Sequence, residues 1–181
     1  MKQTANLALC GVFSALALVV LLLTLFPFAT YALPAVAGIC FIPLTVECGK
    51  RWAYGAYAAV SLLSLLIAPD IEAKMLFIAF FGYYPILKAD IERLKSRFLE
   101  WLCKLAVFNV AAVAGYAMLS CIGFSFEDFR IEGIALPLYG FLIGFLVAGN
   151  VIFVLYDIGI TRFLPFYFSR LRPTLRRFFR Y

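Results

Sequence analysis

The sequence predicts an all-α integral membrane protein with six transmembrane helices and both termini in the cytoplasm. Hydrophobic residues make up 65% of the 181 residues, charged residues make up 14%, and the mean hydropathy is +0.99. Soluble domains typically carry about 25% charged residues. The charges also gather in clusters that separate long uncharged runs. Composition, run length and the sorting of basic residues together predict this fold class in a cell membrane.

The uncharged runs define the predicted spans. A helix rises about 1.5 Å per residue and the hydrocarbon core is about 30 Å thick, so about 20 residues cross it. The first run is 44 residues long, and Pro27 and Pro34 near its centre predict a hairpin of two helices. The chain is interpreted as one domain, 1–181, with spans at about 7–28, 31–46, 52–68, 73–88, 104–124 and 134–157.

The first span carries small residues on one side. Ala8, Gly11 and Ala15 recur at helical spacing, with Ser14 beside them. Small residues let helix backbones approach closely in lipid, where packing drives helix association. Two interpretations stay open, namely a docking face for a partner protein and packing against another span of the same chain.

The second span ends at Glu47, which lies three and four residues before Lys50 and Arg51. Side chains three or four positions apart are neighbours on a helix surface. This spacing predicts a local ion pair at the end of the span. We interpret that pair as structural.

The fourth span is unusually short. Thirteen uncharged residues follow Lys74 before the next base, which is about 20 Å of helix. Asp70 is placed to cap this helix, with Glu72 favourable in its first turn, and Pro85 should kink its inner end. A base is unfavourable at a helix start. We therefore expect Lys74 to face a cavity and to pair with an anionic group, including the acids of the loop 124–133.

Residues 89–103 place apolar side chains at helical spacing among charges. Such a pattern predicts an amphipathic helix at the inner membrane interface. It is interpreted either as a connector between spans or as a contact surface for a cytoplasmic partner.

Spans five and six each contain one amide, Asn109 and Asn150, at similar depths counted from their outer ends. Consecutive antiparallel helices bring equal depths together. We expect the two amides to form a structural polar pair, worth about 1 kcal/mol.

The basic residues sort to one side of the predicted topology. With the N-terminus inside, 14 of the 16 bases lie inside, and only Lys74 and Arg130 lie outside. Cytoplasmic flanks collect Lys and Arg, so this count supports an even number of spans. The basic and aromatic tail 159–181 is expected to contact anionic lipids of the inner leaflet. No nucleic-acid partner is expected, because no groove-reading or stacking motif accompanies the bases.

Several chemistries lack their residues. The chain has no histidine, which removes histidine-based catalysis and most zinc ligation. No phosphate-binding glycine loop or nucleophile elbow is present, and the uncharged runs hold no ionisable group, with Asp157 at the inner edge of span six. We expect no enzyme activity, no cofactor, no metal site and no proton-driven pump.

A six-span chain of this size, with both ends inside and a small-residue first helix, resembles the substrate-binding S components of energy-coupling factor (ECF) transporters over nearly its full length. Members carry Ala-x-x-x-Ala in the first helix, and Gly11-x-x-x-Ala15 is a near match at that place. The resemblance implies capture of a small organic, vitamin-like micronutrient outside the cell. It also implies docking, through the first helix, on a transmembrane coupling protein with two ATPase subunits. Metal-capturing members use an N-terminal histidine, which this chain lacks.

In that family the ligand site lies in the outer loops and the outer halves of later helices. The candidates at those places are Lys74, Glu72, Arg130, Tyr31, Phe126 and Tyr139. The alternative function is a non-catalytic scaffold that resembles the rod-shape-determining membrane proteins of the MreD type, in which the outer charges only keep loops soluble. An outer cavity large enough for a vitamin would distinguish the two.

Overall fold

The computed structural model describes residues 2–26, 29–121 and 138–174, and every regular element within them is a helix. The first half contains α1 (Lys2–Leu22), the 3-10 turn η1 (Leu23–Leu25), α2 (Ala32–Ile39), α3 (Phe41–Glu47) and α4 (Lys50–Ile67). The second half contains α5 (Ile71–Leu76), the π-helix η3 (Phe77–Phe81), α6 (Tyr84–Ile91), α7 (Arg97–Cys121), α8 (Leu138–Phe166) and the π-helix η5 (Tyr167–Leu171). The predicted all-α fold class is confirmed over these ranges.

The first four α-helices pack around one apolar core. α1 lies along α4 and α2, and α3 packs on α4. Ala17 of α1, Ala37 of α2 and Ala53 of α4 are fully buried in this core, so small residues let the helices approach closely. The chain turns from α3 to α4 at Gly49, whose φ of 90° lies in the left-handed region that favours glycine.

The fourth predicted span is a broken helix. α5 begins as expected, because the Asp70 carboxylate accepts hydrogen bonds from the backbone N–H of Glu72 at 2.9 Å and of Ala73 at 3.3 Å. The chain then passes through η3 and turns before α6, which has Pro85 in its first turn. Proline has no N–H to donate back into η3, so the predicted kink at Pro85 is a full break.

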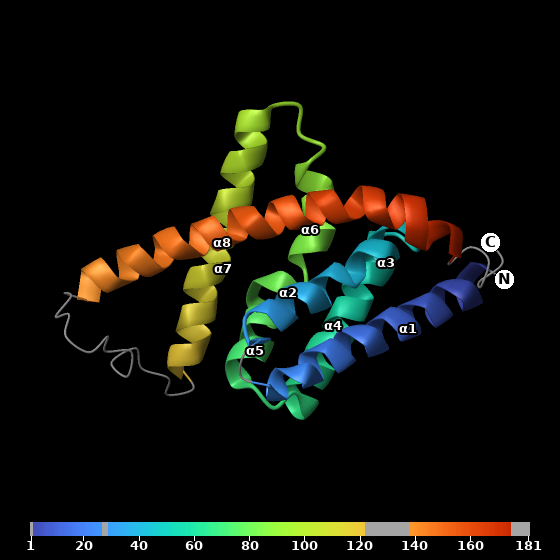
Figure 1. Ribbon diagram of the computed structural model, residues 1–181, viewed down its shortest axis with the longest axis horizontal. Coiled ribbons are helices and arrows are strands. Elements are labelled where there is room, and N and C mark those ends of the chain that lie inside the picture. Colours follow the sequence, from blue (N-terminus) through green and yellow to red (C-terminus); the bar gives the residue numbers. More distant parts are fainter. Residues whose placement is uncertain (1, 27–28, 122–137, 175–181) are drawn as a thin grey trace.

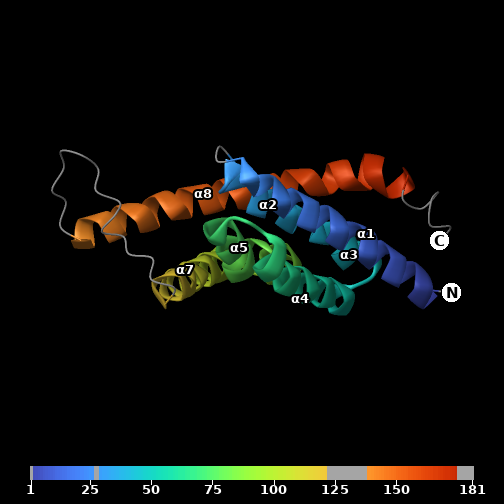
Figure 2. The ribbon, with the colours of Figure 1, turned by 90° about the horizontal axis from the view of Figure 1, so that it is seen from below.

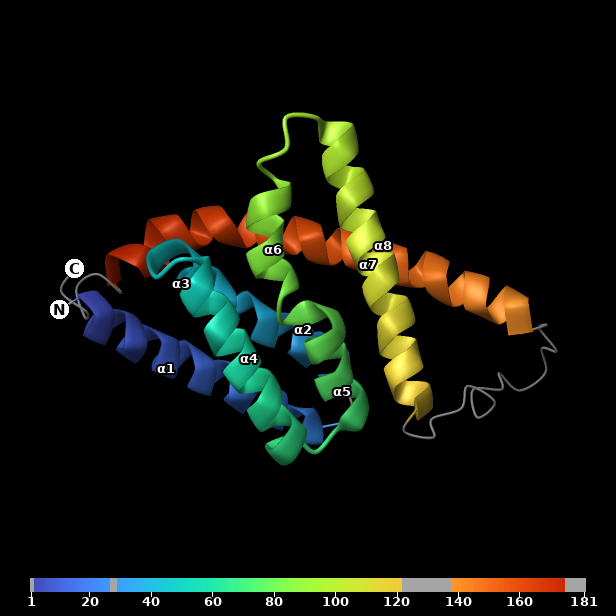
Figure 3. The ribbon, with the colours of Figure 1, turned by 180° about the vertical axis from the view of Figure 1, so that it is seen from behind.

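The second half of the chain lies across the first. α8, a helix of 29 residues, crosses α6 and α7 at a steep angle (Figure 1). Figure 2 shows α8 on one side of the molecule and α4, α5 and α7 on the other. The connection between α6 and α7 projects beyond the other helices, which Figure 3 shows from behind. The start of α1 and the end of α8 lie at the same end of the molecule.

Helices occupy the described parts of all six predicted spans, but they differ in length. Within the described residues, three stretches are long and apolar enough to cross a membrane: Gln3–Leu25, Arg97–Gly115 and Leu146–Thr174. The apolar helix Ala32–Glu47 is shorter. The structure thus supports three candidate spans.

The predicted interfacial helix over 89–103 is wrong. α6 ends at Ile91, residues 92–96 form a turn, and α7 begins at Arg97 and continues without a break. The physical reason is a base on α7: Lys104 binds both Glu92 and Glu100, so the chain must fold back between these two acids.

The end of α8 packs against α3. Tyr167 is fully buried, and the Arg172 Nε lies 2.7 Å from the Glu47 carboxylate. The predicted local pairing of Glu47 with Lys50 is therefore wrong, and Lys50 pairs instead with Asp90 on α6. These contacts cross the fold, and they tie both ends of the α3 to α4 turn to the second half of the chain.

Candidate functional site

Three charged side chains from three helices are buried together. Lys88 of α6 is 1% exposed, Lys104 of α7 is 2% exposed and Asp157 of α8 is 3% exposed. Lysine and aspartate are almost never buried to this extent unless they are paired. The packing of α6, α7 and α8 therefore depends on how these charges are matched.

The charges form a closed ring in which bases and acids alternate. The Lys88 Nζ pairs with Asp157 Oδ1 and lies 2.9 Å from Glu92 Oε1. The Lys104 Nζ lies 3.1 Å from Asp157 Oδ2 and 3.1 Å from the same Glu92 oxygen. Two bases and two acids leave the ring neutral. We call Lys88, Asp157, Lys104 and Glu92 the charge ring.

Neighbouring polar groups complete the hydrogen bonding of the ring. The Tyr84 hydroxyl donates to Asp157 Oδ1 at 2.6 Å, and Lys88 donates to the Thr161 hydroxyl at 3.0 Å. Lys104 binds Glu100 at 2.7 Å and lies over the Trp101 ring. Buried ion pairs overcome their desolvation cost only when such additional hydrogen bonds are present.

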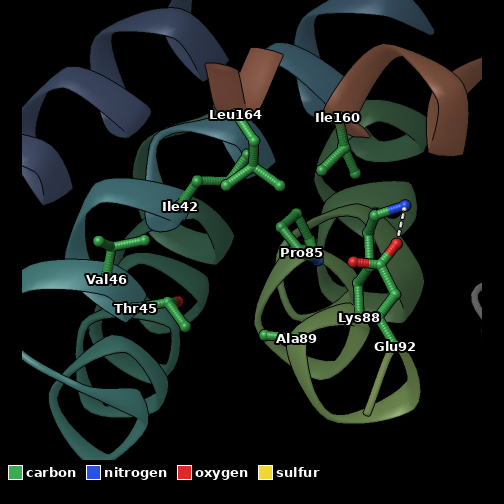
Figure 4. Close-up of a pocket in the computed structure, with 9 residues that line it drawn as sticks. All are labelled: Ile42, Thr45, Val46, Pro85, Lys88, Ala89, Glu92, Ile160 and Leu164. Atoms are coloured by element: carbon green, nitrogen blue, oxygen red, sulfur yellow. Dashed lines mark ion pairs between the residues drawn. The ribbon is translucent and has the colours of Figure 1, made fainter. Parts of the chain in front are cut away.

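One member of the charge ring is partly exposed to solvent, and a small cavity adjoins the ring. The Glu92 side chain is 33% exposed, whereas those of its two partners are 2% exposed. A cavity of about 60 Å³ adjoins Lys88 and Glu92, between α3, α6 and α8 (Figure 4). Ligand pockets usually enclose about 300 Å³ or more, and a water molecule takes about 30 Å³ of liquid. This cavity is sized for water and not for a vitamin.

The charge ring lies at the depth of a candidate span and not outside it. Lys104 falls within the apolar stretch Arg97–Gly115. Exposed apolar side chains begin at Phe98, about two turns before Lys104 on α7, so the ring lies at the depth of this stretch. The uncharged runs hold no ionisable group, as the sequence indicates, but the candidate span on α7 begins before Lys104 and includes it. Ionisable groups at such positions are functional candidates by default.

The uncharged runs do not predict the charge ring, because each run ends at the first charged residue. A lysine that faces the protein interior then marks the end of a span by definition. A signal was present nonetheless, since Lys88 with Glu92 and Glu100 with Lys104 have the spacing of pairs on one helix face.

The two predicted amides, Asn109 and Asn150, meet where α7 contacts α8, on one side of the charge ring. Asn109 and Asn150 exchange two hydrogen bonds of 3.1 Å, and each also donates to a carbonyl of its own helix at 2.8 Å. Phe108 and Phe153 lie between the amide pair and the charge ring. Their stacked aromatic rings have centroids 4.9 Å apart. The contact of α7 with α8 is thus built from an amide layer, an aromatic layer and an ionic layer.

Replacing Asn109 by leucine should lower the free energy of unfolding by about 1 kcal/mol, because Asn150 then keeps only the carbonyl of its own helix. The double variant Asn109→Leu/Asn150→Leu should be at least as stable as the single one, since no amide is left half-paired. Unfolding by detergent titration measures both. A single variant as stable as the parent protein would exclude a stabilising pair.

The candidates at the opposite end of the bundle form a separate polar group. The Tyr31 hydroxyl donates to Glu72 Oε2 at 3.1 Å, which joins the start of α2 to the start of α5. Arg130, Phe126 and the loop acids lie outside the described residues. Tyr139 is the second residue of α8.

Lys74 has partners that the sequence did not suggest. Its Nζ donates to the carbonyl of Ala68 at 3.2 Å and to that of Leu65 at 3.4 Å. These carbonyls lie at the end of α4, where a positive charge is favourable. A base that is unfavourable for its own helix is thus favourable for the preceding one.

The small residues of α1 face away from the rest of the chain. Ala8, Gly11 and Ala15 are exposed, and Ser14 is half-buried. A Cβ atom added at Gly11 would meet nothing within 4 Å. The opposite side of α1 supplies the core with Leu9, Cys10, Ala17 and Leu21. Of the two interpretations of this arc, packing against another span of the same chain is excluded for the described residues.

Comparison of the chain with protein-family models, with curated proteins and with solved structures finds no match.

Proposed function

We propose that the chain is a six-span cell-membrane protein with both termini in the cytoplasm, and that it is the substrate-capture subunit of an uptake system. It binds a small organic, vitamin-like micronutrient at the outer end of the bundle. It docks through α1 on a transmembrane coupling protein with two ATPase subunits. It has no catalytic role of its own.

The observation that carries this proposal is the free small-residue face of α1. Ala8, Gly11 and Ala15 leave a shallow surface along an apolar helix, and nothing in the described chain covers it. Exposed Val12 and Leu16 lie beside them. A surface of small residues flanked by larger ones suits close approach of a second membrane helix.

The two ends of the bundle support different parts of this role. At the outer end, Tyr31 is 61% exposed and bonded to Glu72, which offers hydrogen-bonding groups to a polar ligand. At the inner end, the charge ring fixes α6, α7 and α8 to one another. Fixed inner ends hold these three helices in place below the outer, ligand-binding end.

Gly11→Leu tests the docking. Co-expressed with an ECF coupling protein and its two ATPases, this variant should lose co-purification, because leucine fills the surface on which a partner helix would lie. The matched control is Gly55→Leu on α4, which also meets open space. Unchanged co-purification of the Gly11 variant would refute docking through this face.

A structural scaffold of the MreD type is the second candidate, and the contacts of Lys74 favour it. Lys74 is bonded to carbonyls of α4, so the base expected to hold an anion is already satisfied within the chain. Native mass spectrometry of the purified protein separates the two functions. A retained small molecule supports capture, and a ligand-free protein that still associates through α1 supports the scaffold.

A further inference from the structure

The turn between α6 and α7 carries an unbalanced positive charge. Arg93, Lys95 and Arg97 are all exposed, and none has an acidic partner within 4 Å among the described residues. We call these three residues the basic turn. The turn projects beyond the other helices (Figures 1 and 3), so the bulk of the protein does not cover it.

The acids near the basic turn are engaged elsewhere. Asp90 pairs with Lys50, and Glu92 and Glu100 both bind Lys104. Desolvation and, second, the charge of Arg93 lower the pKa of Lys50 at the start of α4. The three nearest carboxylates are therefore paired with lysines outside the basic turn and do not neutralise it.

Large apolar side chains stand directly beside these bases. Phe98 is 76% exposed, Leu102 is 53% exposed and Trp101 is 38% exposed. Phe98 and Leu102 continue along α7 as one exposed stripe with Ala106, Val110 and Val113, at spacings of three and four residues. The stripe follows the candidate span, so its end at Phe98 marks the boundary of the hydrocarbon and places the three bases at headgroup depth.

We propose that the basic turn, with Phe98 and Trp101, binds the headgroups of anionic phospholipids in the inner leaflet. The inference rests on the proposed membrane topology. Three uncompensated bases match a negative surface, and an aromatic ring between bases and an apolar stripe is the arrangement found at membrane interfaces. Continuity with the lipid-facing stripe favours a lipid over a protein, because a protein partner would not require the apolar surface to continue down the span.

Trp101 provides a local probe of the bound lipid. The chain has two tryptophans, so Trp52→Phe leaves Trp101 as the only one. This variant is placed in bilayers of phosphatidylcholine with a minor fraction of phosphatidylglycerol, and either lipid is brominated in turn to quench the tryptophan. We expect brominated phosphatidylglycerol to quench beyond its share of the bilayer. Each base that contacts a headgroup should give about a fivefold preference.

Two arginine pairs provide the variant and its matched control. Arg93→Gln/Arg97→Gln should lower the preference by about fivefold for each base removed. Arg162→Gln/Arg170→Gln removes the same charge from the tail that is also expected to contact anionic lipids, and it should leave the quenching of Trp101 unchanged, because the end of α8 lies away from the connection between α6 and α7. Raising the salt from 0.1 to 1 M shortens the screening length from about 10 to about 3 Å and should also weaken the preference.

The outcomes separate this inference from the proposed topology. Equal quenching by the two brominated lipids, or a preference that is unchanged in Arg93→Gln/Arg97→Gln, overturns lipid binding by the basic turn. Quenching by neither lipid, in a protein shown by flotation to be in the bilayer, also overturns it and points to another occupant of the turn. Failure of the protein to float with the vesicles overturns the membrane topology instead.

Discussion

Asp157→Asn is expected to lower the free energy of unfolding by about 3–5 kcal/mol. The substitution keeps the size of the side chain but removes the only acid that contacts both lysines from within the buried part of the ring. Lys88 and Lys104 would then share Glu92, which is partly exposed and already bonded to both. The measurement is unfolding of the purified protein in a detergent titration.

Asp90→Asn is the matched control for this change. Asp90 pairs with Lys50 on the surface, with side-chain exposures of 45% and 28%, and such pairs contribute at most about 1 kcal/mol. Adding Lys88→Met to Asp157→Asn should recover stability, because the unmatched buried charge is replaced by an apolar chain of similar length. Equal effects of the two aspartate changes, or a double variant weaker than the single one, would contradict the importance of the ring.

Gly38→Ala is expected to destabilise the protein by about 1–3 kcal/mol or more. A Cβ atom at Gly38 would collide with the backbone carbonyl of Phe81 and would lie 2.9 Å from the Tyr156 hydroxyl. A carbonyl oxygen in η3 cannot rotate away as a flexible side chain does, so α2 would have to move away from η3.

Gly11→Ala is the control, since it adds the same methyl group to a helix with open space around it. There the better helix propensity of alanine should raise stability by up to about 1 kcal/mol. The two variants should thus have effects of opposite sign in one thermal unfolding assay. A neutral Gly38→Ala variant would show that α2 and η3 are less closely packed than described.

Local rules of sequence predicted the local features of the fold. Asp70 caps α5 and Pro85 ends the preceding helix, because each feature depends on residues close in sequence. Asn109 meets Asn150 as predicted, although α8 crosses α7 steeply and does not run antiparallel to it. The same rules failed where a partner came from a distant segment. Glu47 binds Arg172 and not the bases that follow it, and no spacing along the chain encodes that contact.

The charge ring shows the same limit in a sharper form. Hydropathy divides a sequence at its charges, so a span that buries lysine and aspartate is shortened to its uncharged part. The predicted start of span five, residue 104, is one member of the ring, whereas α7 begins at Arg97. Whether a charged side chain lies in water or is buried with a partner depends on tertiary contacts, which the sequence pattern does not contain.

Lys74 illustrates how the electrostatics of one helix depend on its neighbour. Considered with the continuous helical segment of α5 and η3, a base near the start is unfavourable and calls for an external anion. The short turn between α4 and α5 brings it to the last carbonyls of α4, where the same charge is favourable. The connection between the helices, and not the helix that carries the residue, decides the sign of the effect.

The charge ring also has a consequence for the biosynthesis of the protein. Lys88 and Lys104 leave the ribosome well before Asp157, which lies on the last long helix. Until α8 has been synthesised, the two lysines lack Asp157 and, of the described acids, can pair only with Glu92 and Glu100, which are partly exposed. The ring can therefore close only after α8 has packed against α6 and α7, and that step completes the matching of the two buried lysines.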